Sequence, residues 1–244
     1  MNKPPQKNVK TLLIIIIISC SSVSNFYSQD LTNNLKIWSG ISVSYKVNKN
    51  LNVKLSELIA YNASPSNYSF SQTKIALSYK LKRRIYISGG YVRGLFNDSN
   101  SLRRQGATDS WFNKLAVDRI YGNFSYKHTI VKRLSLKHKI EFQHFFTDLD
   151  KYKTRTIYAA RVGYNVRKSS LSPYIEGQFF NYSGGIISSG IKRFRFKSGL
   201  SFKPITDSAM RVSLYYISQN EFKTEALPEN DYAVFGLSLS FKIN

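Results

Sequence analysis

The chain has 244 residues, a formal net charge of +22 and a single cysteine, Cys20. This length fits one large domain or one barrel. The longest apolar run covers only residues 12–18, far short of the roughly 20 residues of a membrane-spanning helix. With no second cysteine, an internal disulfide and a thiolate metal site are excluded from the body of the chain.

The N-terminal segment has the layout of a secretory signal. A lysine-containing start is followed by the apolar run 12–18 and then by small polar residues at 19–24. We expect residues 1–29 to be a signal peptide and residues 30–244 to form one mature domain. Two alternatives remain: a lipobox-like sequence ending at Cys20, which would make that cysteine a lipidated N-terminus, and a buried N-terminal helix or strand.

The strong positive charge restricts the partners of the mature chain. A soluble protein this basic would suggest nucleic acid, but an exported protein does not meet nucleic acid in normal life. We therefore predict no nucleic-acid partner. The charge then belongs either to a cationic barrel interior or to contacts with anionic lipid head groups.

From residue 34 onward, apolar and polar residues alternate in successive stretches, and helical spacing is not sustained. In the first stretch, Ile37, Ile41 and Val43 fall on one face, and Lys36 and Ser42 fall on the other. Alternation with a period of two predicts strands with two unlike faces. In chain order, the expected strands cover residues 35–47, 51–61, 73–81, 85–96, 122–130, 134–143, 157–166, 171–180, 194–202, 209–218 and 235–242.

Three features indicate which face is outside. The strands exceed the usual 5–6 residues of globular sheets and suit the ~9–11 residues that cross a bilayer at a tilt. Lysine and arginine recur within the polar face, whereas the apolar face is rich in phenylalanine and tyrosine. Short connections, as at 131–133, interleave with longer ones, as at 97–113. The pattern predicts an antiparallel up-and-down transmembrane β-barrel of the cell outer membrane; a soluble β-sandwich is the alternative.

The number of strands is the weak point of this prediction. Eleven stretches are clear, but single-chain barrels of bacteria have an even number of strands. We expect 10–12 strands, with 12 preferred. The twelfth would come from residues 27–33 if the signal were cleaved early.

The alternation turns a large set of charged residues toward the interior. We interpret them either as a salt-bridged plug that fills a narrow lumen or as a cationic lumen that selects anions. The expected interior bases are Lys36, Lys46, Lys54, Lys74, Lys80, Arg93, Arg119, Lys127, Lys137, Lys139, Arg161, Arg193, Arg195, Lys197 and Arg211, and the expected interior acids are Glu141 and Glu176.

The three histidines are the main candidates for chemistry. His128 and His138 fall on the outward face of neighbouring strands, and His144 follows on the second of them. An outer-membrane acyl hydrolase would need a serine hydroxyl within reach of a histidine base, but the serines fall on the opposite face. Three histidines without a carboxylate cluster also make a poor metal site. We therefore predict no catalytic residue, metal or cofactor, with a lipid-modifying hydrolase as an alternative and a secreted soluble β-protein that binds anionic polymers as another.

The segment 97–113 suggests a contact with the membrane surface. Arg103 and Arg104 would bind phosphates of lipopolysaccharide, and Trp111 and Phe112 suit the aromatic girdle at an interface. A solvated loop is the alternative.

Several short segments resemble a known family. They are Asp118–Tyr121, Lys137–His144, Leu171–Phe180 with Pro173–Glu176, and Arg193–Phe202 with Ser198–Leu200, together with Trp38, and the resemblance spans most of residues 35–243. They resemble domain-of-unknown-function family 2490, a group of bacterial outer-membrane barrels. The resemblance implies the barrel fold and the outer-membrane location; the family has no settled activity, so it implies no catalytic residues.

The chain departs from the family at a few positions. Lysine or histidine stands in place of arginine at Lys137, Lys139 and His144, and the chain ends in Asn244 rather than an aromatic residue. The nearest aromatic residue to the end is Phe241, through which we expect the barrel-assembly machinery to recognise the protein.

Overall fold

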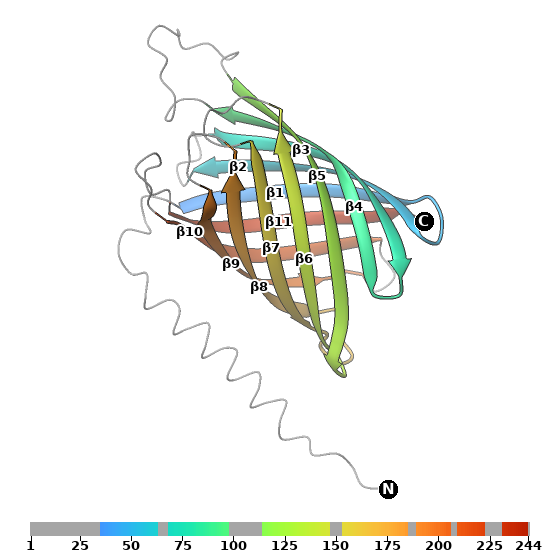
Figure 1. Cartoon of the computed structure of the whole chain (residues 1–244). Helices are drawn as coiled ribbons and strands as arrows, with labels where there is room; N and C mark the ends of the chain where they lie inside the picture. Colours follow the sequence, from blue (N-terminus) through green and yellow to red (C-terminus); the bar gives the residue numbers. More distant parts are fainter. Residues whose placement is uncertain are drawn as a thin grey trace, which may run out of the picture. The chain divides into compact units, whose positions relative to one another are not determined.

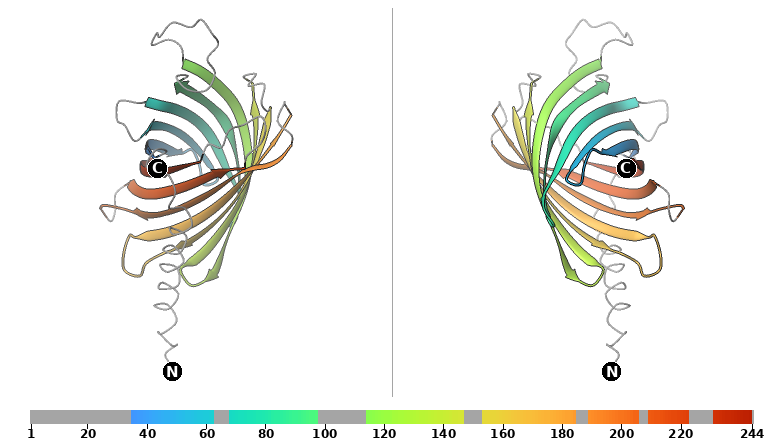
Figure 2. Two further views of the ribbon diagram at one scale, coloured as in Figure 1. Left: turned by 90° about the vertical axis from the view of Figure 1, so that its left-hand side faces the viewer. Right: turned by 90° about the vertical axis from the view of Figure 1, so that its right-hand side faces the viewer.

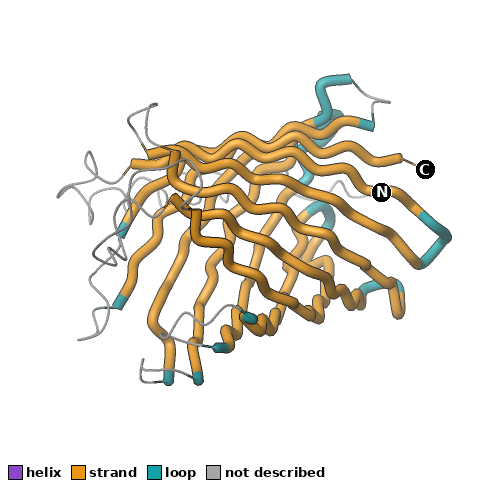
Figure 3. Tube along the Cα trace, turned by 90° about the horizontal axis from the view of Figure 1, so that it is seen from above, coloured by secondary structure: helices purple, strands orange, loops and turns teal. Residues whose placement is uncertain are grey.

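The computed structural model describes residues 35–62, 68–97, 114–146, 153–184, 189–205, 209–222 and 231–243. Within these residues the chain forms strands and turns only, as Figure 3 shows. The expected signal peptide and Cys20 lie outside the described residues. No helix in the described part of the chain is long and apolar enough to cross a membrane.

Every strand that the alternation predicts is present in the structure, with somewhat different bounds. The largest change is in the third and fifth strands, which begin earlier than predicted because their first residues alternate less clearly. The strands are β1 (Leu35–Lys46), β2 (Leu51–Asn62), β3 (Tyr68–Lys82), β4 (Ile85–Asn97), β5 (Lys114–Val131), β6 (Leu134–Phe145), β7 (Thr154–Tyr164), β8 (Ser172–Ser183), β9 (Gly190–Phe202), β10 (Met210–Glu221) and β11 (Tyr232–Ile243).

The strands close into one barrel in sequence order (Figure 1). Each strand pairs antiparallel with its neighbour in the chain, but β1 pairs with β11 in parallel, from Leu35 opposite Ala233 to Tyr45 opposite Ile243. The prediction of a purely antiparallel barrel is therefore wrong at this seam. An odd number of sequential up-and-down strands makes the first and last run in the same direction, so closure has to be parallel. The preferred count of 12 is not met by the described residues, and the segment 27–33 lies outside them.

The two ends of the barrel differ in how the strands are connected. We call the end that carries the connections after β1, β3, β5, β7 and β9 the short-turn end, and the opposite end the loop end. The tightest connections, 83–84 and 132–133, lie at the short-turn end, whereas 98–113 lies at the loop end. The separation by length is incomplete, because 165–171 at the short-turn end is longer than 63–67 at the loop end. Residues Arg103, Arg104, Trp111 and Phe112 lie outside the described residues.

The turn between β1 and β2 shows how the sequence sets such a connection. The Asn48 side-chain oxygen accepts hydrogen bonds from the backbone N–H of Asn50 at 2.9 Å and of Leu51 at 2.8 Å. Asparagine readily forms such local bonds in turns. This turn fixes the register in which β1 meets β2.

The outer face of the barrel is apolar and exposed. Ile41, Leu77 and Phe142 are 49%, 55% and 62% exposed, and their sequence neighbours point inward. Figure 2 shows the strands tilting across the wall from two sides. The predicted assignment of apolar residues to the outer face therefore holds for these strands, and Arg93 is the exception among the charged residues.

Contacts between strands that are not neighbours identify the interior face. The Lys74 ammonium on β3 lies 3.7 Å from the centre of the Tyr121 ring on β5. The Arg195 guanidinium on β9 lies 5.5 Å from the ring of Trp38 on β1. Such contacts are possible only across the inside of the barrel.

Packing inside the barrel is denser toward the loop end. One buried cluster joins β1, β2, β10 and β11, and a second joins β7 and β8 near their loop ends. Lysines near the short-turn end, such as Lys46 and Lys127, stay exposed. The first cluster consists of Trp38, Ala60, Tyr215, Ile217, Tyr232 and Val234, and the second of Ile157, Phe180 and Tyr182.

Candidate functional site

The interior face carries most of the charged residues predicted for it. Strand register and alternation place Lys36, Lys46, Lys54, Lys74, Lys80, Arg119, Lys127, Lys137, Lys139, Glu141, Arg161, Glu176, Arg193, Arg195, Lys197 and Arg211 on this face. They are spread along the lumen, from Lys36 near the loop end to Lys46 and Lys127 near the short-turn end.

Arg93 does not belong to this set. It is exposed on the outer face, where its register partners are Thr73 and Asp118. Its neighbour Val92 is the residue that points inward, and it is buried beside Tyr121. The glycine-rich sequence around Arg93 alternates poorly, so the sequence did not fix which face it takes.

Five of the interior charges lie directly beside one another on consecutive strands. In register across β5 to β9, Lys127 is opposite Lys137, Lys137 opposite Arg161, Arg161 opposite Glu176, and Glu176 opposite Lys197. We call this row the charge ladder. Two of its four neighbouring pairs join like charges, which destabilise a sheet, and two join a base with Glu176. One carboxylate does not balance four bases, so the row carries a net positive charge.

The interior acids on this side of the barrel are already engaged. Glu176 forms an ion pair with Arg161 and accepts a second hydrogen bond from the Gln178 amide. Glu141 lies 3.1 Å from the Lys139 ammonium and accepts from Gln143. Both oxygens of each carboxylate are thus in use.

Three lysines of the charge ladder have no such partner. Among the described residues, Lys127 and Lys137 make no side-chain hydrogen bond or ion pair. Lys197 rests over the Tyr215 ring at 3.7 Å, an attraction that leaves its charge uncancelled. The interior therefore keeps an excess of positive charge at this level.

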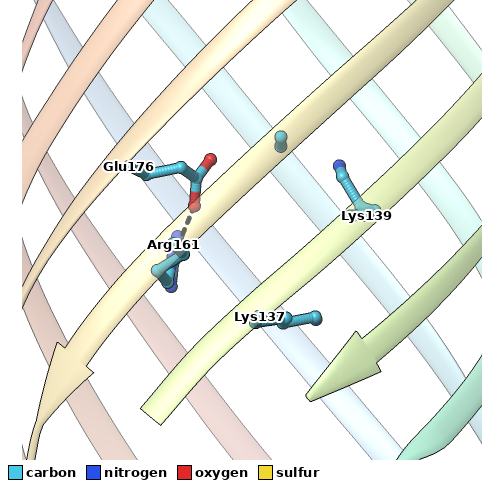
Figure 4. A pocket seen from close by; sticks show the side chains of 5 residues that line it. Lys137, Lys139, Arg161 and Glu176 are labelled. Atoms are coloured by element: carbon cyan, nitrogen blue, oxygen red, sulfur yellow. Dashed lines mark hydrogen bonds and ion pairs between the residues drawn. The ribbon is translucent and has the colours of Figure 1, made fainter. Parts of the chain in front are cut away.

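A cavity of about 170 Å³ opens beside the charge ladder. Figure 4 shows Lys137 and Lys139 on one strand, with the Arg161–Glu176 pair on the strands beside it. Ala159 completes the lining, and its small side chain leaves the space open. We call this space the basic cavity.

Toward the loop end Lys36 lies 4.3 Å from the centre of the Tyr232 ring, and the other basic residues are arginines packed against aromatic rings. The Arg195 guanidinium lies 5.0 Å from the ring of Phe180, and its Nε donates to the Gln219 side-chain oxygen at 3.1 Å. It also donates to the Tyr232 hydroxyl at 3.3 Å. Planar guanidinium groups suit such stacking better than ammonium groups do.

Two further arginines complete this packing. Arg155 donates from Nε to the Gln143 side-chain oxygen at 3.0 Å and lies 5.2 Å from the Phe145 ring. Arg193 forms an ion pair with Glu221. We call Arg155, Arg193 and Arg195 with their aromatic partners the arginine layer. These contacts narrow the lumen toward the loop end.

Arg155 and Glu221 are interior residues that the predicted strands did not include. Both lie beyond the predicted ends of their strands, since β7 begins at Thr154 and β10 continues to Glu221. Extending the alternation backward from Arg161 in steps of two would have placed Arg155 inside.

The histidines form contacts on the outer face. The rings of His128 and His138 stack at 5.9 Å, and the His138 Nδ1 lies 2.7 Å from the Tyr158 hydroxyl. His144 packs edge-on against Phe146. Among the described residues, no serine is hydrogen-bonded to a histidine, and no group of three His, Cys, Asp or Glu side chains could hold a metal ion.

The fold and the site together define a closed all-β barrel with an apolar outer face and a basic interior. The chain belongs to the family described as protein of unknown function (DUF2490), whose model matches residues 35–230. The match covers β1 to β10 and confirms the resemblance found in the sequence. No curated protein matches the chain.

Proposed function

We propose that this protein is a non-enzymatic β-barrel of the bacterial outer membrane, porin-like or structural, whose basic interior attracts small anions. The observation that carries the proposal is the exposure of large apolar side chains on every strand. From β1 to β11 in order, examples of these exposed residues are Ile41, Leu55, Ile75, Ile87, Phe124, Phe142, Tyr158, Phe179, Ile191, Leu214 and Phe235.

Such a surface fits hydrocarbon better than water. Soluble monomers rarely expose contiguous apolar patches beyond a few hundred Å², and a soluble barrel would place its apolar face inside. The strands have 11 to 18 residues, enough for the ~9–11 residues that cross a bilayer at a tilt. Placement in lipid stabilises the apolar face and leaves the charges in an enclosed, hydrated interior.

The excess of lysine and arginine inside supports attraction of anions over cations. Rings of basic residues favour anions electrostatically, and low-dielectric walls concentrate the field of such charges. The arginine layer narrows the lumen toward the loop end. We therefore propose a small, anion-selective passage rather than a wide pore.

Two measurements test the proposal. Membrane fractionation with a heat-modifiability gel should find the protein in the outer membrane, with a compact form that migrates differently until it is boiled. Reconstitution into planar bilayers under a salt gradient should give a small current with a reversal potential of anion-selective sign. Release without detergent, or cation selectivity, would refute the proposal.

The environment of the proposed barrel follows from this location. We propose outer-membrane lipid and lipopolysaccharide as its surroundings and the barrel-assembly machinery as the route by which it is inserted.

A further inference from the structure

We infer that the basic cavity is a binding site for a phosphate-type dianion that enters from the short-turn end. The inference rests on the proposed function, because it takes the cavity to be part of an enclosed lumen. It adds a defined site and a ligand class to a general attraction for anions.

The charge of the cavity matches two negative charges. Lys137, Lys139 and Arg161 line it against the single carboxylate of Glu176, which leaves a formal excess of two positive charges. Glu141 and Lys197, which lie next to these residues, cancel each other, and Lys127 opposite Lys137 adds one more positive charge. A monovalent anion would neutralise at most half of this excess.

The donors that remain free suit phosphate oxygens. Within the described strands and turns, no hydrogen bond or ion pair uses the Lys137 ammonium, and Lys139 gives one contact to Glu141. Arg161 contacts Glu176 through Nε, which leaves its terminal nitrogens for a ligand. Charge-assisted hydrogen bonds to phosphate are among the stronger contacts in proteins, and arginine presents a fork that fits two oxygens.

The cavity has room for such a ligand. Its volume is about 170 Å³, whereas a site for one water needs about 10–15 Å³ in the same kind of measure. A phosphate group therefore fits together with a few waters. Inorganic phosphate or the phosphate end of a small monoester is therefore the expected ligand.

A purely structural plug does not explain the same residues. A plug would balance its charges, but the carboxylates of Glu141 and Glu176 are each engaged through both oxygens with other residues, so neither neutralises Lys137. Lys137 lies directly between Lys127 and Arg161 in the charge ladder. An anion among them would relieve this repulsion.

The more open side of the lumen gives the ligand its route. The arginine layer narrows the lumen on the loop side, while Lys127 stays exposed on the short-turn side. We expect the anion to enter from the short-turn side.

The test uses the full mature barrel refolded in detergent. Calorimetric titration with inorganic phosphate at low ionic strength should show one binding site. Lys137→Gln removes a charged donor without breaking an ion pair, and binding should weaken by about tenfold or more, since hydrogen bonds to charged groups contribute ~1.5–3 kcal/mol. Lys46→Gln is the matched control, because it removes one positive charge from the lumen at a position outside the cavity. The affinity of this variant for phosphate should equal that of the wild type within about twofold.

Each other result contradicts the inference in a way that separates it from the proposed function. Equal weakening in both variants would indicate a diffuse field rather than a site. Competition by chloride as effective as by sulfate would remove the preference for a dianion. Stronger binding of short-chain phosphatidic acid than of phosphate would point to a lipid head group instead. A heat-modifiable barrel that binds no phosphate would refute the site alone, whereas a protein that is soluble without detergent would refute the proposed function itself.

Discussion

Placing a charge on the outer face would test whether that face meets hydrocarbon. Leu77 lies on β3 with its side chain 55% exposed, in register with Val53 and Gly89. Its neighbour Ser78 points into the lumen, where its register partners are Asn52 and Ser88. Leu77→Lys and Ser78→Lys thus add the same charge to opposite faces of one strand.

The two environments predict different costs for Leu77→Lys. A lysine on the lipid face of a membrane barrel costs about 2–4 kcal/mol near the midplane. In water, replacing an exposed side chain usually changes stability by no more than about 0.5 kcal/mol. For Ser78→Lys we expect at most about 1 kcal/mol, because repulsion between hydrated charges is weak.

Urea unfolding of both variants in liposomes, followed by tryptophan fluorescence, would measure these changes in the free energy of unfolding. Leu77→Lys should be less stable than the wild type by at least about 2 kcal/mol, and it should also be less stable than Ser78→Lys. Equal stability of the three proteins, or a larger loss in Ser78→Lys, would refute the assignment of the outer face to lipid.

Three further substitutions test the site and the packing. Glu176→Gln removes the acid of the basic cavity, so phosphate binding measured by calorimetry should tighten by about tenfold. This gain is smaller than the ~4 kcal/mol repulsion between two unit charges 4 Å apart at an effective dielectric of 20. Weaker binding would contradict the site. Trp38→Ala empties part of the largest buried cluster and should lower the free energy of unfolding by about 3–5 kcal/mol, whereas Ser39→Ala on the outer face should leave the urea midpoint nearly unchanged. Gly90→Ala would press a methyl group into the backbone of the neighbouring strand and should cost about 1–3 kcal/mol; the matched Gly122→Ala, with no heavy atom within 4 Å, should unfold at the wild-type denaturant concentration.

The alternation of residues was enough to find the strands and their two faces, because each side chain in a strand takes one of only two directions. It worked best where large apolar and charged residues follow one another, as from Leu134 to Gln143. It failed at Arg93, where flanking glycines have no side chain to mark a face. It stopped short of Arg155 because the first residues of β7 carry no strong pattern.

Alternation could not predict which charged residues lie opposite each other on neighbouring strands. Lys137 lies beside Arg161 only because the turn between β6 and β7 sets one register out of several. The same holds for Arg161 and Glu176, whose strands β7 and β8 are joined by the longer connection 165–171. Alternation specifies the face of a residue but not its partner across the sheet, so the charge ladder and the basic cavity became visible only in the structure.

The parallel seam links closure of the barrel to closure of the lumen. Parallel pairs are slightly less stable per residue than antiparallel ones, and the largest buried cluster draws its residues from both sides of this seam. Gly236 lies opposite Trp38 in β11, and a side chain there would collide with the Tyr215 ring, so the glycine allows that ring to pack against the seam. Tyr232 belongs to the same cluster and also accepts a hydrogen bond from Arg195 of the arginine layer. Opening the lumen at the loop end would therefore disturb the packing that holds β1 to β11, whereas an anion that enters from the short-turn end leaves the seam intact.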